Sequence, residues 1–362
     1  MDKDFSNVSL LIIAGGQSSR MQQDKRLISI GGIGLLESIL IKAVNQNFVQ
    51  IFLCVEESLP FIEQLALKYN AVIVTDKTKK AGPISGLAEG LRRITTEWAL
   101  AVSCDMPFFK FEKVETLIKY LNDDLKVVLP SINGRQQPLA AFYHKSMAEN
   151  FCQSIINNQR KLKIVIEKVP YKIVELSTDV FFNVNTPADL RLARGRIVNA
   201  NRKTPIISII APSSGTGKTT FIERLIPRLS DLNIKVGVVK SDAHGFNLDV
   251  EGKDSFRFQR AGAQSVAVVS PNGWFMIQKT DSRIEFEQIT NKMDNIDLIL
   301  TESRTHGTCP AISLYRGIGE PLINEDVVTL FTSKTIESVN NVIQYNLDDI
   351  DAAVDVCVFL MA

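Results

Sequence analysis

The sequence is poor in cysteine, and its cysteines are not arranged in pairs. The five of them, Cys54, Cys104, Cys152, Cys309 and Cys357, are odd in number, widely spread and without a CxxC motif. Disulfide frameworks need paired cysteines, and thiolate zinc sites need closely spaced ones. The cysteines therefore indicate neither kind of site, and they fit a reducing compartment such as the cytoplasm.

The sequence also lacks an excess of one charge and a long apolar run. It has 41 Lys and Arg against 40 Asp and Glu, a net charge of +1. Such a balance provides no field to recruit nucleic acid or an anionic membrane. No run approaches the roughly 18 apolar residues of a spanning helix, and the first residues, MDKDFSNV, are polar and acidic. We therefore expect a cytoplasmic protein with no nucleic-acid partner and no membrane association.

What the sequence does contain is the pattern of two α/β domains. Its 362 residues are 45% hydrophobic and 22% charged, which is ordinary for soluble proteins, and exceed the size of a single core. Short β-rich runs alternate with helical periodicity, as in parallel sheets built from βα units. In the first half the runs are VSLLII, VQIFLCV, AVIVT, EWALAVS, KVVLPS, PLAAFYH and YKIVELS; in the second they are PIISIIA, KVGVVKS, SVAVVS, IDLILTE and DVVTLFTS.

A polar, basic stretch separates these two groups of runs. A helix with Thr186 as N-cap and Pro187 in its first turn precedes it, and a new apolar run begins at Pro205. We predict a first domain over residues 1–198, a linker over 199–204 and a second domain over 205–362. The expected fold class is α/β, with a Rossmann-like nucleotidyltransferase sheet followed by a P-loop NTPase-type domain.

The first predicted strand runs directly into the loop AGGQSSRMQQDK, residues 14–25. Gly15 and Gly16 would let backbone N–H groups approach a ligand, and Arg20 and Lys25 would add the positive charge that a triphosphate needs. Spacing alone gives equal weight to a glycine turn with surface bases. Asp105 ends another strand, where a carboxylate can hold Mg²⁺, although it could equally cap a helix.

Three further motifs, GPISGL (82–87), QPLAAFY (137–143) and FFNVNTPADL (181–190), complete a family pattern. Together with the first loop, they resemble the molybdenum cofactor guanylyltransferases, the MobA family, across residues 8–196. The resemblance implies an enzyme that transfers GMP from GTP to the terminal phosphate of molybdopterin and releases pyrophosphate. Such a transfer depends on positioning and charge neutralisation and needs no covalent nucleophile from the protein.

The same resemblance implies roles for individual residues. Asp76 would read guanine, Asp105 would hold Mg²⁺, and Asn183 and Asn185 would lie near the pterin phosphate or the metal. The catalytic set would be Arg20, Lys25 and Asp105. The GTP-binding set would be Ile13, Ala14, Gly15, Gly16, Lys25, Asp76, Gly82 and Asp105. Gln22 stands where the family usually has glycine, which implies a stiffer turn.

An alternative for the first domain is a cytidylyltransferase or a sugar nucleotidyltransferase of the same fold. Those relatives tend to have alanine-alanine-glycine in the first loop, whereas this chain has Ala14-Gly15-Gly16. Together with Gly82-Pro83 and Asp76, this favours GTP as the substrate.

The second domain opens with APSSGTGKTT, residues 211–220, between a predicted strand and a helix. This is the context of a P-loop, in which Lys218 reaches the β- and γ-phosphates and Thr219 ligates Mg²⁺. Pro212 replaces the usual first glycine and removes one N–H, but the expected phosphate contacts come later. The predicted nucleotide-binding residues are Ser214, Gly215, Thr216, Gly217, Lys218, Thr219 and Thr220.

Residues 238–263 and 297–316 resemble the MobB family of P-loop proteins. The resemblance implies a GTP-binding adaptor with weak GTPase activity, in which Asp249 and Glu302 join Thr219 around Mg²⁺. It also implies molybdopterin-loading proteins and apo-molybdoenzymes as partners, and a homodimer formed through this domain. The alternatives are a kinase-like domain and an interaction module whose nucleotide only orders its surface.

Overall fold

The computed structural model describes residues 4–15, 24–78, 81–177, 180–241, 253–280, 284, 286–302 and 309–362. The chain divides into two compact units, Met1–Arg194 and Gly195–Ala362. The division falls inside helix α7 (Pro187–Ala200), four residues before the boundary expected at residue 198. A Cβ atom at Gly195 would lie 2.9–3.1 Å from side chains of Pro310, Val328 and Leu360. The last turns of α7 therefore pack with the second unit.

The first unit is built on one mixed sheet with the strand order β10-β7-β9-β6-β1-β4-β5, in which β8 pairs with β7. Strands β1, β4, β5 and β6 run parallel to one another, as the βα pattern predicts, whereas β9 is antiparallel to both β6 and β7. A small hairpin, β2–β3, stands apart. The strands are β1 (Val8–Ile13), β2 (Ser29–Ile30), β3 (Ile33–Gly34), β4 (Ile51–Val55), β5 (Val72–Thr75), β6 (Trp98–Ser103), β7 (Val127–Ile132), β8 (Arg135–Gln136), β9 (Ala140–His144) and β10 (Tyr171–Glu175).

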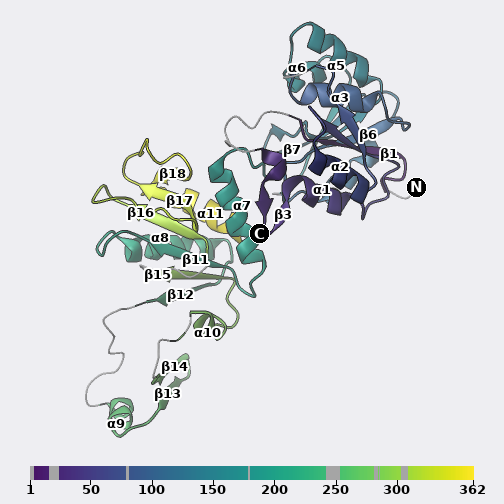
Figure 1. The fold of residues 1–362 in the computed structure, drawn as a ribbon. Coiled ribbons are helices and arrows are strands. Elements are labelled where there is room, and N and C mark those ends of the chain that lie inside the picture. The colour runs from purple at the N-terminus through teal and green to yellow at the C-terminus, as the bar shows by residue number, and fades with distance from the viewer. Residues whose placement is uncertain are drawn as a thin grey trace. The chain divides into compact units, whose positions relative to one another are not determined.

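Helices cover both faces of this sheet (Figure 1). Leu10 and Ile12 of β1 pack in one core with α1 and α2, while Leu11 and Ile13 pack in a second core with α3 and α5. Because alternate side chains of a strand point to opposite faces, a strand buried on both sides reads as the continuous run VSLLII. The helices are α1 (Leu35–Ala43), α2 (Pro60–Lys68), α3 (Pro83–Leu91), α4 (Phe111–Glu115), α5 (Met147–Ile156) and α6 (Leu162–Ile166), with 3₁₀ turns η1 (Lys25–Leu27) and η2 (Ile118–Tyr120).

The second unit contains a six-stranded, all-parallel sheet with the order β12-β15-β11-β16-β17-β18. Helices α8 and α11 pack against each other beside it (Figure 1). Phe221 of α8 meets Phe331 of β17 edge-on, with 5.2 Å between ring centroids. The elements are β11 (Ile206–Ile210), α8 (Lys218–Asp231), β12 (Val236–Lys240), α10 (Phe286–Thr290), β15 (Leu298–Glu302), β16 (Ala311–Tyr315), β17 (Val327–Thr332), β18 (Ile343–Asn346) and α11 (Ile350–Met361).

One predicted strand has a different place from that expected. The run SVAVVS becomes β13 (Ser265–Ser270), which pairs in antiparallel fashion with β14 (Gly273–Gln278) instead of joining the parallel sheet. Pro271 and Asn272 form the turn between the two strands, and helix α9 (Asp254–Arg260) packs against β13. Among the described residues, no helix combines the length and apolarity needed to cross a membrane.

Candidate functional site

In the first unit, the carboxyl ends of β1, β4 and β6 are tied together by backbone hydrogen bonds. The N–H of Ala14 donates to the Cys54 carbonyl at 2.9 Å, and the N–H of Cys104 donates to the Ile13 carbonyl at 3.2 Å. Ligands of open parallel sheets collect at this edge. A Cβ atom at Gly15 would stand 3.3 Å from Oδ2 of Asp76, so glycine lets this loop approach the carboxylate closely. Gly16, Arg20 and Gln22 lie outside the described residues.

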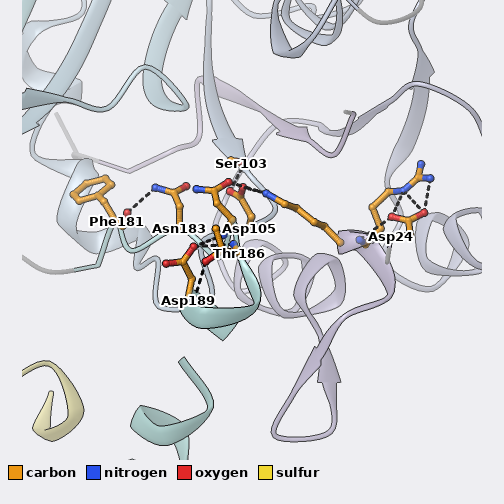
Figure 2. A network of polar contacts seen from close by, with 10 residues as sticks. Asp24, Ser103, Asp105, Phe181, Asn183, Thr186 and Asp189 are labelled. Atoms are coloured by element: carbon orange, nitrogen blue, oxygen red, sulfur yellow. Dashed lines mark hydrogen bonds and ion pairs between the residues drawn. The ribbon is translucent and has the colours of Figure 1, made fainter. Parts of the chain in front are cut away.

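Lys25 connects two residues that lie far away in the sequence. Its Nζ donates to Oδ1 of Asn185 at 2.7 Å and lies 3.3 Å from Oδ2 of Asp105. The other carboxylate oxygen of Asp105 accepts a 2.6 Å hydrogen bond from the Ser103 hydroxyl. Figure 2 shows Ser103 and Asp105 in this network of polar contacts. The structure thus brings together three of the predicted site residues.

The segment before α7 is fixed by its own hydrogen bonds (Figure 2). The carboxylate of Asp189 accepts from the N–H groups of Asn185 and Thr186 at 2.9 and 2.8 Å, and the N–H of Asp189 donates to the Thr186 hydroxyl. This is a capping box with aspartate in the acidic position. The N–H of Val184 donates to the Asp105 carbonyl at 2.8 Å, which ties the segment to the end of β6. Asn183 instead donates from its side chain to the Phe181 carbonyl.

The surroundings of Asp76 disfavour the charged form of its carboxylate. Burial raises its pKa to about 7, helped by the negative charges of Glu56 and Glu89. Its Oδ1 is buried, and no donor among the described residues lies within hydrogen-bonding distance of it. Gly82, which precedes α3, has a positive φ of 76°, a conformation that suits glycine. A buried acceptor without a partner is what a ligand N–H group would satisfy.

In the second unit, β11 leads into a loop with P-loop geometry. Gly215 and Gly217 have positive φ values of 75° and 97°, and α8 begins at Lys218. The Thr216 hydroxyl donates to the Ser213 carbonyl at 2.9 Å, and Nζ of Lys218 donates to the same carbonyl at 3.4 Å. These contacts fold the loop back on itself, while Ser214, Thr219 and Thr220 remain exposed.

Thr219 and Glu302 lie together at this loop. The Thr219 hydroxyl is 3.0 Å from each carboxylate oxygen of Glu302, which ends the neighbouring strand β15. Nζ of Lys240 is 3.9 Å from the same carboxylate. A hydroxyl and a carboxylate side by side at a P-loop supply the oxygen atoms that Mg²⁺ prefers. Asp249, the third predicted ligand, lies outside the described residues.

Comparison with known proteins gives a consistent result for each half. Residues 10–171 match the family described as MobA-like NTP transferase domain, and residues 206–333 match the family of molybdopterin guanine dinucleotide synthesis protein B, MobB. A probable molybdenum cofactor guanylyltransferase of Natranaerobius thermophilus is 31% identical over 52% of this chain and 95% of its own length. A molybdopterin-guanine dinucleotide biosynthesis adapter protein of Haemophilus influenzae is 31% identical over 42% of this chain and 87% of its own. The chain belongs to both families.

The MobA-like half also has a similar solved structure. Molybdopterin-guanine dinucleotide biosynthesis protein A of Archaeoglobus fulgidus aligns with 52% of this chain and 97% of its own at 25% identity and a TM-score of 0.46. The fusion of a MobA-like transferase domain and a MobB domain in one chain agrees with the fold class expected from the sequence.

The oxygen atoms around Lys25 suit a magnesium ion in the MobA-like domain. Oδ2 of Asp105 and Oδ1 of Asn185 already converge on one cation, the lysine ammonium. Mg²⁺ in nucleotide sites usually takes one or two protein oxygens and completes its shell with phosphates and water. The described residues contain no cluster of three or more His, Cys, Asp or Glu side chains that could hold a metal, so a site here would depend on the nucleotide for further ligands.

Sequence reasoning missed two residues that support the two sites. Ser103 holds the Asp105 carboxylate, and Nε of Arg316 donates to the Thr216 carbonyl at 2.7 Å. The helix start expected at Thr186 is confirmed, and its partner Asp189 also fixes Asn185. Ser103 and Arg316 carry no motif that would have singled them out.

Proposed function

We propose that the MobA-like domain is a molybdenum cofactor guanylyltransferase. It would transfer GMP from GTP to the terminal phosphate of molybdopterin, or of its molybdenum-loaded form, and release pyrophosphate. The observation that supports this best is the convergence of Lys25, Asp105 and Asn185 beside the first loop. The family relatives named guanylyltransferases support the same activity.

In this proposal the protein positions and neutralises charge. An oxygen of the pterin phosphate attacks the α-phosphorus of GTP, the bond from that phosphorus to the bridging oxygen breaks, and pyrophosphate leaves with the bonding electrons. Lys25 and Arg20 would neutralise the triphosphate, and the loop of Ile13, Ala14, Gly15 and Gly16 would wrap it. Bound Mg²⁺, held by Asp105, would supply further positive charge. No protein nucleophile is needed, because phosphorus transfer depends mainly on alignment and electrostatics.

Asp76 is suited to select guanine. A carboxylate accepts two hydrogen bonds, and guanine offers two donors on one edge, whereas cytosine offers one amino group there. The buried Oδ1 of Asp76, beside Gly86, would accept one of them. Gly82 would keep the backbone close to the base. Asn183 and Asn185 would contact the pterin phosphate or the metal from the segment that leads into α7.

For the MobB domain we propose GTP binding, slow hydrolysis and an adaptor role. Residues 214–220 would hold the phosphates, and Thr219 and Glu302, with Asp249, would surround Mg²⁺. Molybdopterin-loading proteins and apo-molybdoenzymes are the partners that such an adaptor would bring to the transferase. The adjacency of Thr219 and Glu302 supports the metal site.

A homodimer through the MobB domain is part of this proposal. Hairpin β13–β14 carries exposed apolar side chains, among them Val269, which is 79% exposed, and Trp274, which is 69% exposed. A two-stranded hairpin is marginally stable alone in water, and exposed apolar surface of this kind marks an association surface. A second copy covering it would remove both liabilities.

The test of the transferase function is nucleotide choice. Purified full-length protein, Mg²⁺ and molybdopterin are incubated with GTP or CTP, and the pterin dinucleotide is quantified by mass spectrometry. We expect GTP to be favoured by at least about 100-fold in kcat/KM, because CTP would leave part of the Asp76 acceptor unpaired. Turnover of CTP with no use of GTP would favour the cytidylyltransferase alternative, and transfer to a sugar phosphate would favour the sugar nucleotidyltransferase alternative.

A further inference from the structure

A small recess of about 60 Å³ lies beside the phosphate loop of the MobB domain. Loop residues 212–216 form one wall, and Arg316 and Ile318 form the other. Arg316 directly follows β16, which neighbours β11 on one side, whereas Glu302 ends β15 on the other side. The phosphate loop is therefore flanked by the Thr219–Glu302 pair on one side and by the recess on the other.

Arg316 holds the phosphate loop from outside. Its Nε donates to the Thr216 carbonyl at 2.7 Å. In a trans peptide the carbonyl oxygen and the next N–H point in opposite directions, so this contact turns the Gly217 N–H away from Arg316. One terminal nitrogen of the guanidinium would stand only 3.0 Å from a Cβ atom at Gly217. The guanidinium plane thus lies against the loop and leaves the loop's interior to phosphate.

The turn after β16 presents an apolar side chain beside this guanidinium. Gly317 and Gly319 have positive φ values of 84° and 69°, and the Tyr315 hydroxyl donates to the Gly319 carbonyl, which closes the turn. Ile318 at its tip is 76% exposed. Across the recess stands Pro212, which is also exposed. The turn therefore places an apolar side chain and the guanidinium together in the wall of the recess.

The strand register determines how far this turn extends past the end of β11. Ile210, the last residue of β11, pairs with Ser313, and β16 continues for two residues to Tyr315. The turn therefore rises above the end of β11, next to the loop. Tyr315 in turn pairs with Thr332, the last residue of β17, so that the exposed Ser333 and Lys334 leave the sheet at the same level. Polar groups are thus available beside the apolar ones.

We propose that Arg316, Ile318 and Pro212 form the platform on which the base of a purine nucleoside triphosphate lies in the MobB domain. Guanidinium planes and apolar side chains stack on planar bases, and the polar residues 333–334 would contact the base edge. This inference rests on the proposed nucleotide binding by the same domain. It also gives Pro212 a role, because a residue in the wall of a base site needs no N–H for phosphate.

The test is photolabelling of the full-length protein with GTP that carries an azide on the base. Trypsin cleaves after Arg316 and after Lys334, so mass spectrometry of peptide 317–334 reports on the second domain alone. We expect the adduct on this peptide in the wild type and its loss in Lys218→Ala, which lacks the phosphate anchor. Ile318→Ser and Arg316→Lys should raise the half-saturating probe concentration about tenfold. Leu232→Ser, an equally apolar-to-polar change at an exposed site of the same unit, should leave it unchanged.

Inorganic tripolyphosphate as competitor separates a base platform from a phosphate contact. It should inhibit labelling with the same inhibition constant in the wild type and in Ile318→Ser and Arg316→Lys. Weakened competition in both variants, an adduct confined to other peptides of the second domain, or unchanged labelling in both variants would overturn the inference alone. Absence of any labelling of the second domain in the wild type would overturn the proposed nucleotide binding and the inference with it.

Discussion

The two domains hold their key lysines in different ways. In the MobA-like domain, Lys25 forms an ion pair with Asp105, the carboxylate proposed to hold Mg²⁺. In the MobB domain, Lys218 donates to the Ser213 carbonyl, while Glu302 accepts from the Thr219 hydroxyl. The carboxylate proposed to hold the metal thus contacts the lysine in the first site and a threonine hydroxyl in the second.

This difference has a chemical consequence. A site whose cation and carboxylate neutralise each other must exchange partners when GTP and Mg²⁺ enter, so that lysine turns to phosphate and aspartate to metal. Such an exchange aligns both groups on the reacting phosphates. In the P-loop site, the hydroxyl and the carboxylate proposed to hold the metal already lie together, a geometry that suits holding a nucleotide. The transfer reaction should therefore be sensitive to the first pair and insensitive to Lys218.

Asp105→Ala should have the largest effect. We expect transfer to fall by at least about 10³-fold, because the change removes the proposed metal ligand and the carboxylate that pairs with Lys25. Formation of the pterin dinucleotide is the measurement, with circular dichroism to check the fold. Asp124→Ala, at an exposed aspartate, is the matched control and should be fully active. Retained transfer in Asp105→Ala would show that the metal assignment is wrong.

Lys25→Ala should come next, with a loss of about 10²-fold. It removes one charge-assisted contact to the triphosphate but keeps the carboxylate that holds the metal. The same assay measures it, with Lys113→Ala, at an exposed lysine, as the control. A loss confined to KM for molybdopterin would indicate that Lys25 serves the acceptor and not GTP.

Lys218→Ala should affect nucleotide binding by the second domain and leave transfer by the first unchanged. We expect transfer to stay within about twofold of the wild type, while labelling of the second domain by a GTP analogue weakens by at least about tenfold. Lys235→Ala, at an exposed lysine of the same unit, should change neither quantity. If Lys218→Ala lowered transfer as much as Asp105→Ala does, the division of labour between the domains would be wrong.

Asp76 should give the first domain a pH dependence of modest size. Its pKa is about 7, and only the ionised carboxylate can accept both guanine donors. KM for GTP should therefore be about tenfold higher at pH 6 than at pH 8, the ratio expected for a group with that pKa. Asp76→Asn should raise KM and remove this difference. Asp123→Asn, at an exposed aspartate, should keep the wild-type profile.

The same group should affect folding in the opposite direction. Because its folded pKa lies above the unfolded value of 3.8, the folded state binds more protons between about pH 4 and 7, and stability falls as pH rises through that window. The Tm of Asp76→Asn relative to the wild type should therefore rise by about 2 °C or more between pH 5 and 8. A constant difference in Tm would contradict the raised pKa.

The sequence predicted the local parts of this architecture well. Continuous apolar runs such as VSLLII and PIISIIA indicated buried parallel strands, and the glycines before Lys218 indicated the P-loop. Contacts between residues far apart in the chain could not be predicted from the sequence. Arg316, for example, meets Thr216 across 100 residues because β16 lies beside β11. Strand order and register determine these contacts, and no short motif records them.

The hairpin and the domain division show the same limit. The run SVAVVS has the composition of a buried strand, yet β13 is largely exposed because its partner is β14 and not the parallel sheet. Helix α7 has one continuous pattern, and only the packing of Gly195 against Leu360 reveals that its end belongs with the second unit. Both facts depend on residues far along the chain.

The most direct test of the central claim follows the phosphorus atoms. Full-length protein, Mg²⁺ and molybdopterin are incubated with GTP labelled at either the α- or the γ-phosphorus. The account predicts that the α-label enters the pterin dinucleotide and that the γ-label leaves as pyrophosphate. Transfer of the γ-label to the pterin would indicate a kinase, and release of the γ-label as free phosphate with no α-label in the pterin would indicate hydrolysis only. Either result would contradict guanylyl transfer.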